Sequence, residues 1–202
     1  MFSLNRRLAK MTDLKARKEH HGDELVLACD LKFSVEISND ELAEFSPSLK
    51  ASLYQRDDSS RNYEVIDAPD HLTQIKNPEI KKVKWDAEYL QARYVVHHGI
   101  DDRNDTVFGL AKIARFEIEP KEGGTCVVGY RVYTHPTEEQ VAHLTTFLGE
   151  TVFVTLDPDG GDDPEDVDDA SYNGGDSNDG YAPSEPEKPK RTRKKRQMDL
   201  VE

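Results

Sequence analysis

The amino-acid sequence predicts a mainly β protein: an antiparallel β-sandwich or partly closed barrel, with two or three short helices at its edges and a disordered C-terminal tail. Three observations predict it. Apolar and polar residues alternate over long stretches, turn-forming residues separate these stretches, and sizeable apolar side chains become rare after Leu156. Alternation with a period of two is typical of strands that bury one face, and short turns between such strands favour antiparallel pairing.

The clearest strand is predicted at 25–37, where every odd position is apolar. Because side chains alternate across a strand, Phe33 and the other odd residues share a buried face. Residues 14–20 are expected to pair with this strand across a turn at 21–23. The basic residues 1–12 are expected to form a flexible N-terminus.

Capping sequences predict the first two helices. Ser38 followed by Glu41 matches a capping box, in which each side chain binds a backbone N–H of the other residue. A short helix should therefore run through Phe45. Pro47 is tolerated in the first turn of a helix, so a second one is expected to end near Leu53.

The later strands follow the same alternation. Residues 55–82 are polar and are expected to form a long excursion with at most short structure. Beyond it, strands are predicted at 83–96, 106–119, 126–132 and 152–156. The phase of the alternation slips near Leu90, which predicts a β-bulge. Residues 120–124, which end in two glycines, are expected to close a hairpin.

A third helix is predicted between the last two strands. Thr137 and Gln140 form another capping box. Val141, Leu144 and Leu148 follow at helical spacing and are expected to form its apolar stripe.

The C-terminal residues differ sharply from the rest. The folded domain is assigned to 13–156, an acidic tail to 157–187 and a basic end to 188–202. Residues 157–187 contain twelve acidic residues and no basic one, and 188–196 contain seven basic residues and no acidic one. Blocks of like charge stay extended and serve as interaction tails. The formal charge of the whole chain is −13, which argues against a strong binder of duplex DNA.

No catalytic motif, metal site or cofactor site is predicted, and we expect that the protein is not an enzyme. Cys29 and Cys126 lie in strand patterns and are expected to be reduced core thiols. The paired histidines at 20–21 and 97–98 flank predicted turns, which favours surface positions. No apolar run is long enough to span a membrane, since a spanning helix needs about 20 apolar residues. The expected location is the cytoplasm of a bacterial host, or the nucleus if the host is a eukaryote.

Two groups of basic residues are candidates for nucleic-acid binding. In the folded domain, basic residues alternate with aromatic ones, a combination that single-strand binders use to track phosphates and stack on bases. These candidates are Lys81, Lys82, Lys84, Arg115 and Arg131. The second group lies at the basic end and comprises Lys188, Lys190, Arg191, Arg193, Lys194, Lys195 and Arg196. The neighbouring rings, Trp85 and Tyr89 among them, also fit a purely structural role in the core.

Three segments, 31–42, 47–54 and 116–136, resemble small, poorly characterised proteins encoded by tailed phages and prophages. The resemblance covers about residues 30–156, with a variable gap at 55–82. Such proteins often accompany recombination and replication genes, so the resemblance implies a role in DNA metabolism or against the host. A β-domain followed by an acidic tract and a basic cluster also resembles nucleoplasmin-type histone chaperones in architecture.

The leading hypothesis is a phage-type accessory protein that binds single-stranded DNA or a partner in DNA recombination or replication. The alternative is a protein-interaction module, either an inhibitor of a host protein or a chaperone for basic partners. A homo-oligomer is compatible with both hypotheses.

Overall fold

The computed structural model describes residues 1–22, 24–56, 72–99 and 105–160. These residues contain nine strands and three short helices. The strands are β1 (Leu4–His21), β2 (Glu24–Ser38), β3 (Tyr54–Gln55), β4 (Gln74–Ile75), β5 (Val83–Trp85), β6 (Tyr89–His97), β7 (Thr106–Lys121), β8 (Thr125–Thr134) and β9 (Thr151–Asp157). The helices are the 3₁₀ helix η1 (Asn39–Glu44) and the α-helices α1 (Leu49–Leu53) and α2 (Glu138–Thr145).

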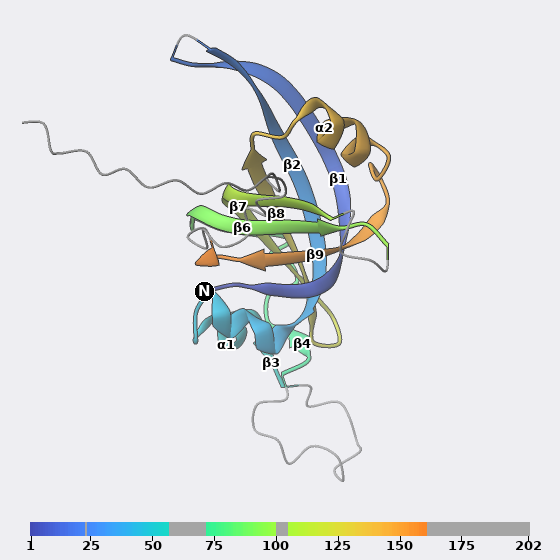
Figure 1. Ribbon diagram of the computed structural model, residues 1–202. Coiled ribbons are helices and arrows are strands. Elements are labelled where there is room, and N and C mark those ends of the chain that lie inside the picture. The colour runs from blue at the N-terminus through green and yellow to red at the C-terminus, as the bar shows by residue number, and fades with distance from the viewer. Residues whose placement is uncertain (23, 57–71, 100–104, 161–202) are drawn as a thin grey trace, which may run out of the picture. The chain divides into compact units, whose positions relative to one another are not determined.

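Six antiparallel strands close into a barrel (Figure 1). Their order is β7-β6-β9-β1-β2-β8, and β8 pairs with β7 to complete the circle. β5 pairs with β7 outside this circle, and β3 and β4 form a separate two-stranded sheet. The predicted class, a mainly β fold with short helices at its edges, is confirmed in its barrel form.

The barrel interior is filled by large side chains. Phe33 is fully buried, and its ring centroid lies 5.3 Å from that of Tyr94 and 6.0 Å from that of Tyr130. The two tyrosine hydroxyls, which lie 3.0 Å apart, hydrogen-bond to each other. Burial raises the pKa of both hydroxyls. Since narrow barrels are packed by side chains, any ligand of macromolecular size must bind on the outside.

The N-terminus corrects the prediction of a flexible segment at 1–12, because most of it belongs to β1. Phe2 is fully buried and stacks on Phe45 with ring centroids 4.6 Å apart. The buried residues of this segment have even numbers up to Leu4 and odd numbers from Ala9 onward. A shift in the β1–β9 register between Leu4 and Arg7 changes the phase. Because that bulge interrupts the alternation, a pattern with a period of two does not predict this strand.

The predicted capping boxes are both present, at Ser38 and at Thr137. The first one starts a 3₁₀ helix. The second starts α2, whose Leu144 is buried, whereas Leu148 is 48% exposed and does not belong to the apolar stripe. The bulge predicted near Leu90 is also confirmed, since the β6–β7 register shifts between Tyr89 and Ala92.

The C-terminal limit of the folded residues lies beyond the predicted residue 156. β9 includes Asp157, which pairs with Arg93 of β6. From residue 161 onward, the predicted acidic and basic segments lie outside the described residues. No helix among the described ranges is long and apolar enough to cross a membrane.

Candidate nucleic-acid interface

A pocket of about 530 Å³ lies on the outer face of the barrel, where β2, β8, β7 and β5 are neighbours. Four of the side chains that line it are cations, one from each strand, and two are carboxylates. The cations are Lys32, Lys84, Arg115 and Arg131, and the carboxylates are Asp86 and Glu117. Trp85 and Phe116 supply its aromatic wall. We call this pocket the tryptophan pocket.

The strand register places the cations together. Lys32 of β2 lies directly opposite Arg131 of β8, so their side chains stand side by side on the outer face. Arg131 is in turn paired with Ala114 of β7. Lys84 of β5 is paired with Glu117 of β7. Residues that are distant in the sequence therefore converge because β2 and β5 pair with the two strands of the β7–β8 hairpin.

Arg115 reaches the pocket through a β-bulge. Its φ is 58°, in the left-handed region that a long side chain rarely adopts. The β7–β8 register shifts between Ala114 and Glu117, so β7 has one residue more than its partner there. Bulges re-aim side chains and are frequent next to functional sites. Left-handed backbone at a non-glycine residue costs about 1–2 kcal/mol, and such strain concentrates at functional sites.

Ion pairs orient part of the cationic cluster. Arg131 Nη1 lies 2.6 Å from Oδ2 of Asp30, a residue that is only 7% exposed. This pair fixes the guanidinium at the pocket. Lys32 Nζ lies 3.9 Å from Glu117 Oε2, an ion-pair distance that is too long for a hydrogen bond. The lining keeps a surplus of positive charge, although the chain as a whole is acidic.

Three of the five basic residues predicted in the folded domain line the tryptophan pocket: Lys84, Arg115 and Arg131. Lys81, which is exposed and precedes β5, does not line the pocket. Lys82 does not line it either, and its Nζ lies 3.9 Å from Glu117 Oε2 and 3.7 Å from Glu119 Oε2. The seven predicted residues from Lys188 to Arg196 lie outside the described residues.

Sequence reasoning missed Lys32. It stands on the polar side of the strand predicted at 25–37, so the alternation already gave its outward direction, but only the barrel brings it beside Arg131. Trp85 packs on Phe45 at 6.2 Å between ring centroids, as the structural role expects, and it also lines the pocket. Tyr130, in contrast, is fully buried and cannot stack on a ligand.

His97 and His98 correct the expectation of surface histidines. His97 Nδ1 contacts Asp105 Oδ2, and its Nε2 lies 2.8 Å from Thr155 Oγ1. The linked groups are a carboxylate, an imidazole and a hydroxyl, in the order found in a catalytic triad. However, the backbone N–H of Arg6 donates to the same Thr155 hydroxyl, at 3.2 Å. Because that contact makes the hydroxyl part of the β1–β9 bulge, we interpret the contacts of Asp105, His97 and Thr155 as structural.

His98 is buried in a second contact network. Its Nε2 lies 2.8 Å from Thr106 Oγ1, and its ring centroid lies 4.2 Å from that of His143 and 4.7 Å from that of Phe147. Burial, aided by the neighbouring His143, lowers the pKa of His98. No group of three or more metal-binding side chains occurs within the described residues. The ring therefore joins β6 to α2 through packing.

The two cysteines are buried and unpaired, as the strand patterns predict. Burial raises the pKa of the Cys29 thiol, and it raises that of Cys126 to about 12. Both thiols are therefore protonated at neutral pH and poorly reactive.

Comparison with known proteins assigns no family to this chain: no family model, no curated protein and no solved structure matches it. The functional argument therefore rests on the geometry of the outer face.

Proposed function

We propose that this chain binds single-stranded nucleic acid at the tryptophan pocket, as a phage-type accessory protein in DNA recombination or replication. The observation that carries the proposal is the convergence of four cations from four strands in a pocket that is also lined by the partly buried indole ring of Trp85. Cations that track phosphates and an aromatic ring that stacks on a base are what single-strand recognition needs. The phage context rests on the sequence resemblance alone.

The charge distribution favours a single strand over a duplex. Residues 1–156 have a formal charge of −6, so the positive charge is confined to a local region. A duplex presents a wide, densely charged surface and is bound through broad basic faces. A pocket of about 530 Å³ with an aromatic wall instead matches the size of individual nucleotides that can leave a stack.

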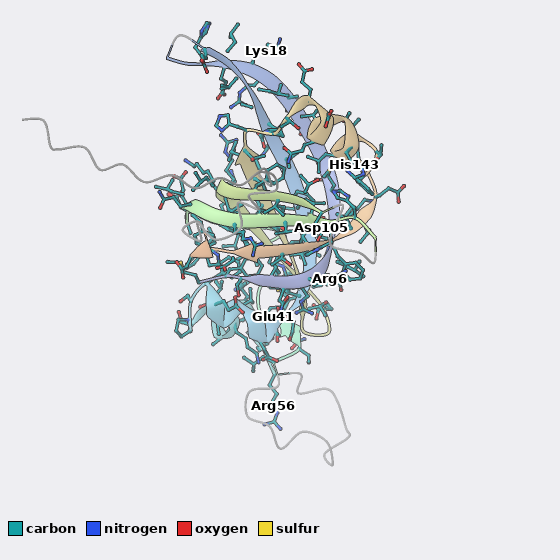
Figure 2. All side chains as sticks on the ribbon, in the orientation of Figure 1. Arg6, Lys18, Glu41, Arg56, Asp105 and His143 are labelled. Atoms are coloured by element: carbon teal, nitrogen blue, oxygen red, sulfur yellow. The ribbon has the colours of Figure 1, made fainter. Side chains whose placement is uncertain are left out.

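Trp85 makes a direct test straightforward, because it is the only tryptophan in the sequence. Titration of the full chain with oligothymidylate should quench its fluorescence, since a stacked base alters the environment of the indole. A matched duplex should quench it much less. The Lys84→Gln variant should bind more weakly, while Lys18→Gln, which removes a cation near the tip of the β1–β2 hairpin, should bind as the wild type does (Figure 2).

Absence of quenching and of any gel shift with single strands at low salt would overturn the proposal. Equal quenching by duplex DNA would reassign the site to general polyanion binding. Loss of binding in Lys18→Gln as large as in Lys84→Gln would show that the charge of the protein matters and the pocket does not.

A different surface supports the alternative, a protein-interaction module. Leu90, Val107 and Leu110 are 66%, 44% and 67% exposed on the outer face of β6 and β7. Exposed apolar side chains that gather on one face favour contact with another protein. If that face mediates self-association, Leu90→Ser with Leu110→Ser should shift the sedimentation coefficient toward that of a monomer. An unchanged coefficient would show that this face does not mediate self-association.

A further inference from the structure

A second basic pocket, of about 670 Å³, lies on the outer face of β1, β2 and β9. Arg6, Arg7 and Lys10 line it, together with two exposed apolar side chains. These are Phe153, which is 42% exposed, and Leu8, which is 54% exposed. We call it the phenylalanine pocket. No pattern in the sequence predicted it, because the segment was expected to be flexible.

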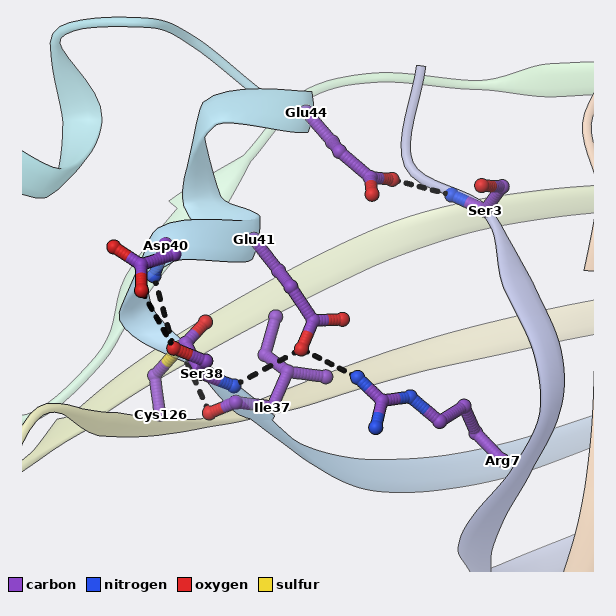
Figure 3. Close-up of polar contacts among 8 residues, drawn as sticks. All are labelled: Ser3, Arg7, Ile37, Ser38, Asp40, Glu41, Glu44 and Cys126. Carbon is purple, nitrogen blue, oxygen red and sulfur yellow. Dashed lines mark hydrogen bonds and ion pairs between the residues drawn. The ribbon is translucent and has the colours of Figure 1, made fainter.

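The two pockets share an unusual backbone feature. Within the described residues, the non-glycine positions with positive φ are Arg6, at 45°, and Arg115, at 58°. Each arginine lies at a β-bulge, and each lines one pocket. At Arg6 the bulge is held in place, because its backbone N–H donates to Thr155 Oγ1. Arg7 beside it forms an ion pair with Glu41 of the first capping box (Figure 3).

The pockets adjoin on the outer face of β2. Lys32 lines the tryptophan pocket, and Ser34 lines the phenylalanine pocket. Residues two apart on a strand point to the same side and lie roughly 7 Å from each other. Ser34 is paired with Lys10 of β1 on one side and with Gly129 of β8 on the other. A serine and a glycine therefore stand between the pockets, where larger side chains would form a wall.

We propose that the two pockets form one continuous track for a single strand, from Phe153 across Ser34 and Gly129 to Trp85. This inference rests on the proposed function and deepens it. The track crosses the neighbouring strands β9, β1, β2, β8, β7 and β5, roughly 24 Å at the usual spacing between strands. An aromatic ring lies at each end for base stacking, and cations along it meet the phosphates.

Gly129 offers a way to block the track without removing a charge. Its φ is not in the left-handed region, and an added Cβ would lie 3.8 Å from the carbonyl oxygens of Glu117 and Phe33, an ordinary contact distance. Gly129→Gln should therefore fold and place a side chain between the pockets. Gly109→Gln is the matched control, because Gly109 lies on β7, lines neither pocket and has open space around its Cβ position.

The test compares oligothymidylates of about 4 and about 16 nucleotides, the limits of the site sizes known for small β-barrel domains. In the wild type the longer strand should bind at least roughly tenfold more tightly, the gain expected from another stacked base and its phosphates. Gly129→Gln and the pair Lys10→Gln with Phe153→Ser should both lose that gain. Their affinity for the shorter strand, read from Trp85 fluorescence, should stay that of the wild type.

The outcomes separate this inference from the proposed function. If the shorter strand binds the wild type but the gain with length persists in both variants, the track does not exist and the tryptophan pocket acts alone. If neither strand binds the wild type, the proposed function itself fails. Should Gly129→Gln not fold, as judged by its circular dichroism, the Lys10 and Phe153 substitutions decide, since both residues are exposed. All variants retain the C-terminal basic residues, so those cannot produce the difference.

Discussion

The interior and the outer face of the barrel are built from the same strands but follow different rules. Inside, the alternation is regular: the odd residues of β2 from Cys29 to Ile37 are all buried. Outside, the two basic pockets occur where regularity fails, at the bulges that contain Arg6 and Arg115. The comparison indicates that regular alternation specifies the fold, while interruptions of the alternation position the cations.

The largest expected effect is on the free energy of unfolding, and it should differ between two neighbouring residues on opposite faces of β2. Phe33→Ala should lower the free energy of unfolding by about 3–5 kcal/mol, because it empties the centre of the aromatic core. Lys32→Ala, one residue away, should change it by less than about 0.5 kcal/mol but weaken binding of a single strand. Denaturant unfolding measures both values. A cost below about 1 kcal/mol for Phe33→Ala would contradict the assignment of the interior.

The next effect concerns the hydroxyl pair in the core. Tyr94→Phe and Tyr130→Phe should each cost about 1–3 kcal/mol, because each leaves one buried hydroxyl without its partner. The double variant should cost less than the sum of the single variants, since it removes both polar groups together. A double-mutant cycle from denaturant unfolding gives the coupling. Additive costs would mean that the hydroxyls do not depend on each other.

The C-terminal charge blocks should change binding with opposite signs. Alanine at Arg191, Arg193, Lys194, Lys195 and Arg196 removes cations that can neutralise phosphates, so affinity for single strands should fall. Deletion of 161–187 removes carboxylates that compete for the same cations, so affinity should rise. Both effects should fade as salt increases. If neither change alters affinity at low salt, the charge blocks take no part in nucleic-acid binding.

The sequence was sufficient for most of the interior because burial repeats with a fixed period along one strand, but it missed the buried Phe2 and Leu4 and assigned Leu25, which is 60% exposed, to the buried face. Phe33, Tyr130 and Leu144 follow such periods, and the capping boxes add the helix starts. The outer face could be predicted only in part. Lys84, Arg115 and Arg131 attracted notice through nearby aromatic residues, but the convergence of the four cations depends on the β2–β8 and β5–β7 pairings, which place Lys32 and Lys84 beside the β7–β8 hairpin. Those two pairings join segments that are distant in the sequence, and no local pattern encodes them.

The smallest effect tests the link between strain and binding at Arg115. Glycine adopts positive φ without steric cost, so Arg115→Gly should raise the free energy of unfolding by up to about 1 kcal/mol, after allowance for the entropy that glycine loses on folding. Arg115→Ala removes the same cation and keeps the strain, so it should not be more stable than the wild type. In both variants the slope of the logarithm of affinity against the logarithm of salt concentration should become shallower by about 0.7, the value for one phosphate contact on a single strand. Thermal unfolding and salt titrations measure the two quantities independently. A glycine variant less stable than the alanine variant would disprove the strain, and an unchanged slope in both would remove Arg115 from the interface.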